Sequence, residues 1–313
     1  MDTGAAAGVS FVIPVFNKRP FVAGMVAGLA GQHGDFPREF IFIDDGSTDG
    51  SGDLIGELTR ASPDVRLIRQ PNRGPSIATN VGIAAARYPL IKPVDADDIL
   101  LPHATALLSR AMARHPDAAL AFGAVESVAA PAAALSRRLD EDAAAGASAF
   151  AFDALPSLLR NCSLGPSACL LRADAVRRAG GCDERVFIQD YSLFLRLAAA
   201  GPFVRVDTAA ALQPEAAPGR LNDGGPQVLH DLNLALYHFL SEHRVASAQA
   251  REAVRRGIAR AWHWARRREG RGFCNPMLWP LLRAAAVPGV QLGLLRQSCA
   301  AFTLSRPVRL TAG

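Results

Sequence analysis

The first hundred residues alternate between short apolar runs rich in β-branched side chains and segments long enough to form a helix. A helix that returns the chain between two strands makes successive strands run parallel, so this alternation predicts βαβ units. We therefore expect an α/β fold with an open, mostly parallel, Rossmann-like sheet flanked by helices. The expected strands are Val9–Val15, Glu39–Ile43, Val65–Arg69, Leu90–Val94 and Ala118–Val125.

Helices are expected between these strands and again further along the chain. Residues 131–149 are mostly Ala and Ser and predict a poorly specified helix or a loop, and Asn161–Arg172 is expected to be extended. A stretch rich in Pro, Gly and Asn, Gln213–Pro226, indicates a boundary. We expect a catalytic domain over residues 1–212 and a basic, mainly α-helical C-terminal region over residues 213–313. The expected helices of the first domain are Pro20–Gln32, Asp49–Ala61, Ser76–Ala86, Pro102–His115 and Asp190–Ala200.

Charge is divided unevenly along the chain. From Arg244 to the end there are thirteen arginines and two glutamates, a net charge of +11, whereas the preceding residues carry −6. The division indicates an acidic body and a basic appendage that would meet an anionic surface or partner. Half of the residues are hydrophobic, which excludes a disordered chain.

Two further classes are excluded by cysteines and apolar runs. Five cysteines without a Cys-x-x-Cys pair do not form a zinc ribbon or a disulfide scaffold, and we expect buried thiols in a reducing compartment. Residues 1–8 lack the pattern of a secretory signal. The apolar stretch over residues 277–302 is interrupted by Arg283, Pro288 and Arg296, too often for a membrane span. A cytoplasmic chain, soluble or peripheral at the inner membrane face, is expected.

Acidic residues follow two of the expected strands, at the edge where open parallel sheets bind ligands. Asp44 and Asp45 follow one strand, and Asp95, Asp97 and Asp98 follow another. Like charges brought together raise one another's pKa unless a cation neutralises them. Oxygen ligands alone indicate Mg²⁺ or Mn²⁺, which complete their shells with water and phosphate, so a nucleoside diphosphate is the implied ligand. The alternative is structural, because the same residues commonly form turns and helix caps.

The order of the motifs is more specific than any one of them. The chain reads VSFVIPVFN, IFIDDGSTDGS, NRGPSIATNVGIAAA, VDADD and then a lone acidic residue before FLRLAAAG. This order resembles the family 2 glycosyltransferases of the GT-A fold over Val9–Gly201, about two thirds of the chain. The resemblance implies inverting transfer of a sugar from a nucleoside-diphosphate donor, usually UDP, to an acceptor hydroxyl. The processive motif Gln-x-x-Arg-Trp is absent, which favours single-sugar transfer.

The resemblance assigns roles to residues around the donor nucleotide. Pro14 and Phe16 match positions beside the donor base, and Asp45 matches the acid that hydrogen-bonds the base. A loop that closes on the nucleotide is represented by Asn72 and Gly74.

The remaining assignments concern the metal and the reaction. Asp95 and Asp97 match the Asp-x-Asp pair that holds ribose, metal and diphosphate, and Asp98 matches the extra acid beside it. Asp190 matches the catalytic base. It is expected at the start of a helix, where the helix dipole keeps a carboxylate ionised, although an N-cap would occupy the same position.

Three positions depart from the family pattern. Gln189 stands where the family usually has Glu, and Thr79 stands where it often has Arg. Arg220 and Asn222 are the nearest match to an Arg-x-His motif. These departures motivate an alternative, a GT-A domain without activity that acts as a binding or assembly module. A sugar nucleotidyltransferase is a further alternative, but it would carry a Gly-rich, Arg-containing loop where this chain has PVFNKRP.

Motifs of other nucleotide-binding classes are absent. Neither Gly-x-Gly-x-x-Gly nor Gly-x₄-Gly-Lys-Ser/Thr occurs, which argues against dinucleotide dehydrogenases and P-loop NTPases. His230 and His238, eight residues apart, are interpreted as surface or satisfied core histidines.

The basic C-terminal region has two interpretations. Its arginines, interleaved with Trp262, Trp264 and Phe273, would lay a helix on an anionic membrane surface, or they form the solvated face of a bundle whose tryptophans are core. Nucleic acid is a poorer candidate, because no recognition module accompanies the charge. A glycan or lipid-linked acceptor of cell-surface polysaccharide synthesis is expected, bound by the variable loops Ala129–Gly165 and Gln213–Pro226.

Overall fold

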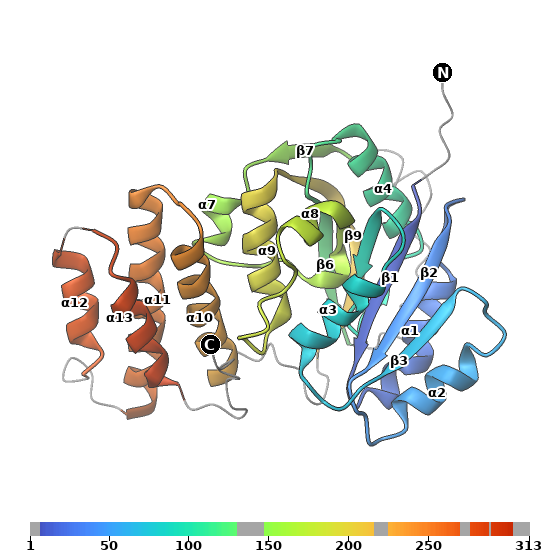
Figure 1. Cartoon of the computed structure of the whole chain (residues 1–313), viewed down its shortest axis with the longest axis horizontal. Coiled ribbons are helices and arrows are strands. Elements are labelled where there is room, and N and C mark those ends of the chain that lie inside the picture. The colour runs from blue at the N-terminus through green and yellow to red at the C-terminus, as the bar shows by residue number, and fades with distance from the viewer. Residues whose placement is uncertain (1–6, 130–146, 216–224, 270–275, 288, 303–313) are drawn as a thin grey trace. The chain divides into compact units, whose positions relative to one another are not determined.

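The computed structural model describes residues 7–129, 147–215, 225–269, 276–287 and 289–302 (Figure 1). The chain forms two compact units that are interleaved in sequence. The first unit comprises residues 1–153, 163–182 and 200–218, and the second comprises residues 154–162, 183–199 and 219–313. The division expected after residue 212 stays a prediction.

The first unit contains a sheet and the helices that cover it. Its strands are β1 (Val9–Val15), β2 (Arg38–Asp44), β3 (Val65–Arg69), β4 (Leu90–Pro93), β5 (Ile99–Leu100), β6 (Leu120–Val128), β7 (Ala149–Phe152), β8 (Cys169–Arg172) and β9 (Phe203–Pro214). Its helices are α1 (Arg19–Ala30), α2 (Ser51–Leu58), α3 (Pro75–Ala85), α4 (Ala104–Arg114), the 3₁₀ turn η1 (Pro166–Ala168) and α8 (Ala173–Arg178).

The sheet has nine strands in the order β3-β2-β1-β4-β8-β6-β9-β5, with β7 paired to β9. Strands β1, β2, β3, β4, β6 and β9 run in one direction, and β5, β7 and β8 run in the other. The predicted mostly parallel α/β sheet is therefore confirmed.

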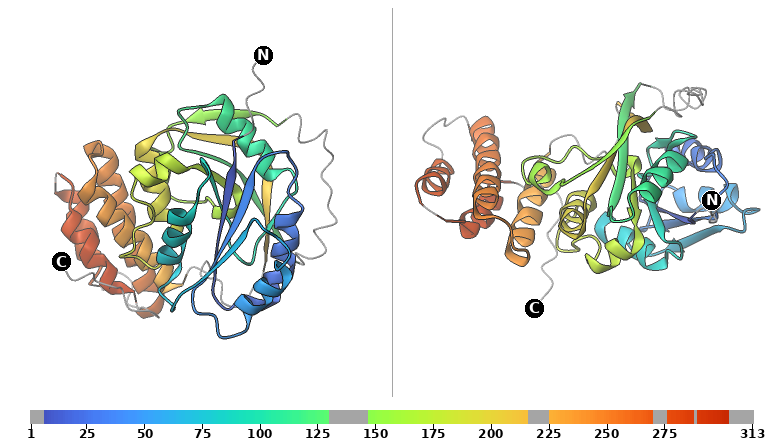
Figure 2. Two further views of the ribbon diagram at one scale, coloured as in Figure 1. Left: turned by 45° about the vertical axis from the view of Figure 1, so that its right-hand side comes forward. Right: turned by 90° about the horizontal axis from the view of Figure 1, so that it is seen from above.

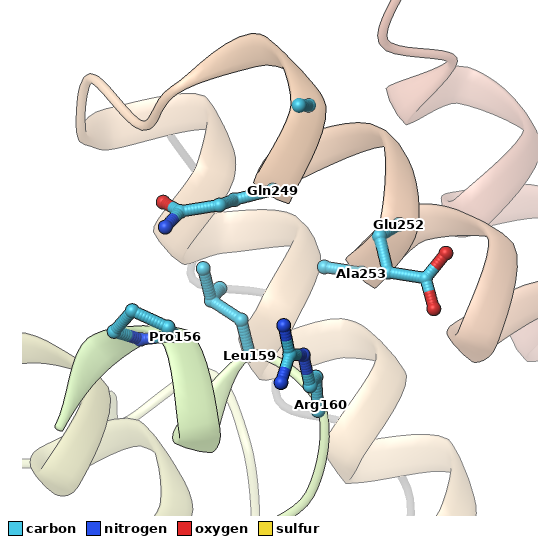
Figure 3. Close-up of a pocket in the computed structure, with 7 residues that line it drawn as sticks. Pro156, Leu159, Arg160, Gln249, Glu252 and Ala253 are labelled. Atoms are coloured by element: carbon cyan, nitrogen blue, oxygen red, sulfur yellow. The ribbon is translucent and has the colours of Figure 1, made fainter.

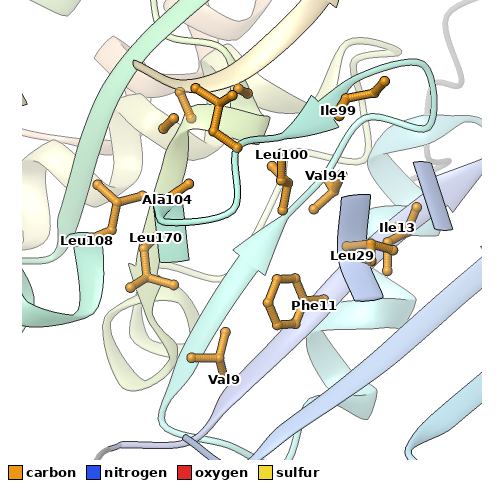
Figure 4. Packing of buried hydrophobic residues seen from close by; sticks show 14 of the residues in the cluster. Val9, Phe11, Ile13, Leu29, Val94, Ile99, Leu100, Ala104, Leu108 and Leu170 are labelled. Atoms are coloured by element: carbon orange, nitrogen blue, oxygen red, sulfur yellow. The ribbon is translucent and has the colours of Figure 1, made fainter. Parts of the chain in front are cut away.

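The central strands are buried on both faces, as strands of parallel sheets usually are. On one face Phe11 and Ile13 belong to the apolar core, part of which is shown in Figure 4. On the other face α3 lies so close that a Cβ atom at Gly82 would come 2.3 Å from Val12. This tight packing fixes the strands whose ends carry the candidate site.

The second unit is helical in the part of the chain that the structure describes (Figure 2). Its elements are α7 (Leu155–Leu158), α9 (Gln189–Ala200, of which the last residue belongs to the first unit), α10 (Pro226–Glu242), α11 (Ser247–Glu269), α12 (Leu278–Ala286), α13 (Leu292–Ser298) and the 3₁₀ turn η3 (Cys299–Ala301). The amide of Asn233 in α10, fully buried, donates to the Gly257 carbonyl and to the Ser298 hydroxyl and accepts from Arg260. One side chain thus joins α10, α11 and α13.

Several expectations need correction. The segment expected to be extended from Asn161 is a strand only over β8. Strand β9 lies where the sequence indicated no strand, and Ala149, assigned to a loop, begins β7. Residues 131–146 of that loop lie outside the described residues. Helix α2 begins only after Gly50, whose φ of 81° is left-handed.

Candidate functional site

The polar segments that follow β1, β2 and β4 meet at one edge of the sheet. Strand β1 lies between β2 and β4, with Val15 opposite Asp44 and Val12 opposite Pro93. Since neighbouring strands are about 4.8 Å apart, β2 and β4 run about 10 Å from each other, with Pro14 and Phe16 at the end of the strand between them. The predicted convergence at one edge is confirmed, but the groups are spread along it.

Asp45 organises the loop over residues 70–74. Its carboxylate is buried and accepts hydrogen bonds from Gln70 Nε2 (2.7 Å), the backbone N–H of Arg73 (2.8 Å) and that of Gly74 (2.8 Å). A carboxylate has about four acceptor positions, and these donors use three of them. Asp45 therefore keeps capacity for one further donor.

Two glycines allow this loop to approach β2. At Gly46, with φ of 77°, a Cβ atom would lie 2.8 Å from the backbone nitrogen of Asn72. Gly74, with φ of 91°, precedes the first residue of α3. Asn72 and Gly74 are thus brought beside the end of β2, the position expected for a loop that closes on a ligand.

Asp44 has a structural role. Its Oδ1 accepts the backbone N–H of Ser47 (2.9 Å), and a Cβ atom at Gly52 would come 2.0 Å from its Oδ2. The carboxylate therefore belongs to the turn into α2, as the alternative interpretation of this motif expected.

Asp97 is paired with a cation from the chain itself. Lys18 Nζ, in the loop after β1, lies 2.7 Å from Asp97 Oδ2, and the two side chains are 17% and 11% exposed. Nearby, Ser167 Oγ accepts the backbone N–H of Asp95 (2.9 Å). Sequence reasoning missed Lys18 and Ser167. The motif PVFNK offered a signal for Lys18, whereas Ser167 lies 72 residues from Asp95 and had none.

A second lysine lies beneath the same loop. Lys92 in β4 is fully buried and donates to the carbonyl oxygens of Ser167 and Cys169. Burial lowers the pKa of Lys92 to about 8, against the opposing effect of nearby acidic groups that include Asp98 and Asp95. Lys92 thus holds η1, and η1 holds Asp95.

The described residues include no group of three or more His, Cys, Asp or Glu side chains placed to hold a metal ion. In this structure Asp44 and Asp45 accept hydrogen bonds from N–H donors and Asp97 is paired with Lys18, so the cation expected at this edge stays a prediction. Asp95 and Asp97 still fit Mg²⁺ or Mn²⁺, because these ions typically use one or two carboxylates and complete their shells with phosphate and water.

Asp190 belongs to the second unit, as the second residue of α9. Its Oδ1 accepts the backbone N–H of Tyr191 (2.6 Å). Burial raises the pKa of Asp190, and the hydrogen bonds from backbone N–H groups only partly oppose it. The expected lowering by the helix dipole is thus outweighed by desolvation, and a raised pKa suits a general base.

The segment before α9 is fixed by Asp231 of α10. The Oδ2 atom of Asp231 accepts the backbone N–H groups of Phe187 (2.9 Å) and Ile188 (3.1 Å). Its Oδ1 lies 3.1 Å from Gln227 Nε2 and 2.8 Å from His230 Nδ1. Asp231 therefore positions the start of the helix that carries Asp190.

A second buried carboxylate lies in the same unit. Burial alone would raise the pKa of Asp183, but hydrogen bonds from His238 (2.8 Å) and Arg185 (2.7 Å) outweigh it and hold this pKa well below its usual range. His230 and His238 are both hydrogen-bonded within the unit, which confirms their interpretation as satisfied histidines.

The departures from the family pattern have different surroundings. Thr79 is buried in α3 and its hydroxyl is without a hydrogen-bond partner among the described residues. Asn80 exchanges two hydrogen bonds with the backbone of Cys182. Gln189 is the first residue of α9, and Arg220 and Asn222 lie outside the described residues.

A small cavity of about 190 Å³ lies in the second unit, between the segment around α7 and the start of α11 (Figure 3). Pro156, Leu159 and Arg160 line one side, and Gln249, Glu252 and Ala253 line the other. Pro156, Leu159 and Arg160 belong to the loop expected to bind the acceptor, but none of the predicted donor-site residues and not Asp190 lines the cavity, and it is smaller than the usual ligand pocket of 300 to 1,000 Å³. We assign it no part in the site.

Comparison with known proteins finds similarity in the first part of the chain. The sequence model of the family described as Glycosyl transferase family 2 matches residues 10–138. Uncharacterized glycosyltransferase EpsJ of Bacillus subtilis is 37% identical over 91 residues, 29% of this chain and 26% of that protein. Succinoglycan biosynthesis protein ExoU of Rhizobium meliloti is 33% identical over 103 residues, 33% of this chain and 30% of that protein. The matched segment thus spans about a third or less of these relatives.

Solved structures share the fold over most of the chain. The S. aureus TarS structure in complex with UDP-GlcNAc has a TM-score of 0.65 at 15% identity, covering 88% of this chain and 79% of that one. The mannosyltransferase PcManGT from Pyrobaculum calidifontis, in complex with GDP-Man and Mn²⁺, has a TM-score of 0.56 at 16% identity, covering 96% and 85%. The GT-A fold is thereby confirmed.

Proposed function

We propose that this chain, whose residues 10–138 match the Glycosyl transferase family 2 model, transfers a single sugar from a nucleoside-diphosphate donor, UDP-linked, to an acceptor hydroxyl with inversion. One observation supports this most: Asp45 and Asp97 follow β2 and β4, the strands on opposite sides of β1, whose axes are about 10 Å apart. Such a spacing suits one extended ligand with a hydrogen-bonding base at one end and an anionic group at the other. It does not suit a single ion bound by all the carboxylates.

The base end of the donor would lie against Asp45. The acceptor position left on this carboxylate suits the N–H of a uracil ring. Phe16, half-buried at the end of β1, would pack against the base beside Pro14. Asn72 and Gly74 would close over it from the loop that Asp45 already orders.

The diphosphate end would lie against Asp95 and Asp97, with Asp98 behind them. A divalent metal held there, Mn²⁺ or Mg²⁺, would supply charge neutralisation for the departing diphosphate. Lys18 brings a positive charge to the same place, within 2.7 Å of Asp97, and can turn toward phosphate oxygens when the donor binds. Lys92 and Ser167 hold the backbone of Asp95 in place.

Asp190 would act as the general base. One of its carboxylate oxygens takes the proton from the acceptor hydroxyl, and the acceptor oxygen forms the new bond to the anomeric carbon. The bond from that carbon to the diphosphate oxygen breaks, and its electron pair stays on the nucleoside diphosphate. A single in-line displacement of this kind inverts the anomeric centre.

The acceptor is a glycan or a lipid-linked sugar of cell-surface polysaccharide synthesis, reached in the cytoplasm. The relative named for succinoglycan biosynthesis supports this class of acceptor. No helix among the described residues has the length and apolar character needed to cross a bilayer.

Titration calorimetry of UDP, GDP and ADP, each with and without Mn²⁺, tests the donor site. We expect micromolar, metal-dependent binding of UDP that is lost in Asp97→Asn. The matched control is Asp64→Asn, because Asp64 precedes β3 at the opposite edge of the sheet. Equal UDP binding by the native chain and Asp97→Asn would contradict the proposed site.

A domain without activity remains the competing function, favoured by Thr79 in place of arginine and by Gln189 in place of glutamate. A glycan product formed from UDP-sugars and lipid-linked acceptors would exclude it. Release of pyrophosphate from a nucleoside triphosphate and a sugar phosphate would instead indicate a sugar nucleotidyltransferase.

A further inference from the structure

Helix α12 of the second unit turns its largest apolar side chains outward. Trp279 is 74% exposed and Leu282 is 50% exposed, whereas Ala284 is buried. Trp279, Leu282 and Ala286 recur at helical spacing and are all exposed, so they form one stripe. Single exposed leucines are ordinary, but a stripe that includes tryptophan usually marks an interaction surface. The one buried residue of this helix is thus an alanine, whereas its largest residue, Trp279, faces away from the protein.

The direction of α12 relative to α11 follows from the contacts between the two helices. Arg255 Nε and Nη2 donate to the carbonyl oxygens of Ala284 (3.2 Å) and Ala285 (3.0 Å), near the end of α12. Because α12 follows α11 in the chain and its end lies beside Arg255, the two helices are antiparallel (Figure 1). Trp279 therefore lies about 9 Å from Ala285, toward the C-terminal end of α11.

Three exposed arginines, Arg266, Arg267 and Arg268, occupy that end of α11. Arg267 lies about 18 Å along the helix from Arg255, so the arginines and Trp279 share one end of the helix pair. Exposed Arg283 on α12 adds a fourth positive charge beside the stripe. An apolar stripe and an arginine cluster thus lie toward the same end of this helix pair.

The tryptophans of α11 have another role. Trp262 is buried, with the Arg266 guanidinium 5.5 Å from its ring centroid, and Trp264 lies against Phe302 at 6.2 Å. They pack within the helical unit, as the second interpretation of this region expected. Among the described residues of this unit, the exposed large hydrophobic side chains are instead those of Trp279, Leu282 and Val287, in α12 or directly after it.

We propose that α12 and the arginine end of α11 form a surface that docks on an anionic membrane. Trp279 and Leu282 would lie at the boundary between lipid and water, where indole rings are favoured, and the four arginines would bind lipid phosphates. A second copy of this chain fits less well, because the same C-terminal region carries a net charge of +11 and would repel itself. The inference does not depend on the proposed sugar transfer.

Binding of the full chain to vesicles tests the proposal. Phosphatidylcholine vesicles with and without phosphatidylglycerol are used, some with lipids that quench tryptophan near the headgroups. We expect the chain to bind only vesicles that contain phosphatidylglycerol. The quenching lipids should then lower the fluorescence of Trp279, and Trp279→Phe should abolish this quenching. Replacing Arg266, Arg267 and Arg268 by glutamine should weaken binding about 100-fold, since each basic residue near such a surface contributes about fivefold.

The control separates docking by the stripe from general attraction of a basic protein. Trp279→Ser with Leu282→Ser should lose most of the binding, whereas Leu58→Ser, which removes a side chain 46% exposed in the first unit, should lose none. Binding unaffected by the double variant, or an absence of quenching in the native chain, would overturn the proposal. A different result would be that the native chain self-associates in ultracentrifugation without binding vesicles, and that the double variant abolishes this self-association. That result would assign the stripe to a second copy of the chain and would also overturn the proposal.

Discussion

Replacement of Asp231 tests how the start of α9 is held. Asp231 is 1% exposed, and its carboxylate accepts the backbone N–H groups of Phe187 and Ile188 and contacts Gln227 and His230. Alanine would leave both backbone donors buried without acceptors, at a cost of about 1 to 3 kcal/mol each. We therefore expect Asp231→Ala to lower the free energy of unfolding of the second unit by about 4 kcal/mol.

Asparagine at this position should be much milder. Its carbonyl oxygen can accept both backbone N–H groups, while its amide faces a flipped Gln227 and the other tautomer of His230. What is lost is the charge assistance of these hydrogen bonds, about 1 to 2 kcal/mol. The pair of variants therefore separates the acceptor role of Asp231 from its charge.

Urea unfolding followed by tryptophan fluorescence measures both variants, because all three tryptophans of the chain lie in the second unit. With a slope of about 1.5 kcal/mol/M, Asp231→Ala should lower the midpoint by roughly 2 to 3 M. A midpoint for Asp231→Ala within about 0.7 M of the native value, with an unchanged slope, would refute the reasoning.

Four other changes test separate features. Asp190→Asn should lower the rate of sugar transfer about 10²- to 10⁴-fold without changing nucleotide affinity in calorimetry. In the native chain, the acid limb of the pH profile of kcat/KM should lie above the ordinary aspartate pKa, because burial raises the pKa of Asp190. Between the folded pKa of Lys92, about 8, and the ordinary lysine value, the unfolded chain binds more protons than the folded one. The free energy of unfolding measured by circular dichroism should therefore rise from about pH 8 to pH 10, and Lys92→Met should remove this rise. The lowered pKa of Asp183 stabilises the fold above the ordinary aspartate pKa, so fluorescence-detected stability should fall on acidification below about pH 4, and less steeply in Asp183→Asn. Gly82→Ala should lower the thermal midpoint, at a cost of about 1 to 3 kcal/mol, because its Cβ would come 2.3 Å from Val12; an unchanged midpoint would show that α3 can move away.

Much of the first half of the fold could be predicted from local pattern. Each of the strands β1 to β3 is a short segment with β-branched or aromatic residues that is followed by a turn and a helix, and the predicted Val65–Arg69 has the bounds of β3. Strand β9 was missed because its second half, TAAALQP, has little β-branched character, and its pairing with β6 supplies what its sequence lacks. Two-residue β5 has no periodicity to detect.

For the candidate site, the sequence predicts which strand ends carry the carboxylates but not the hydrogen-bond partners of these carboxylates. Parallel pairing alone brings Asp45 and Asp95 to one edge, because it fixes where the strands end. It does not fix which donors a carboxylate meets, and Lys18 reaches Asp97 across 79 residues of chain. The hydrogen bonds that these carboxylates make depend on side-chain directions in loops, which no periodic pattern encodes.

The interleaving of the two units also affects how the chain folds as it is made. Helix α9 leaves the ribosome before β9 completes the sheet of the first unit and before α10 brings Asp231 to the segment that precedes it. Domains usually fold as units in order of synthesis, but here neither unit is complete when α9 emerges. The segment that precedes this helix must therefore wait for its acceptor Asp231, which is translated about 30 residues after the helix ends. A chain ending at residue 212 would release that segment without its acceptor.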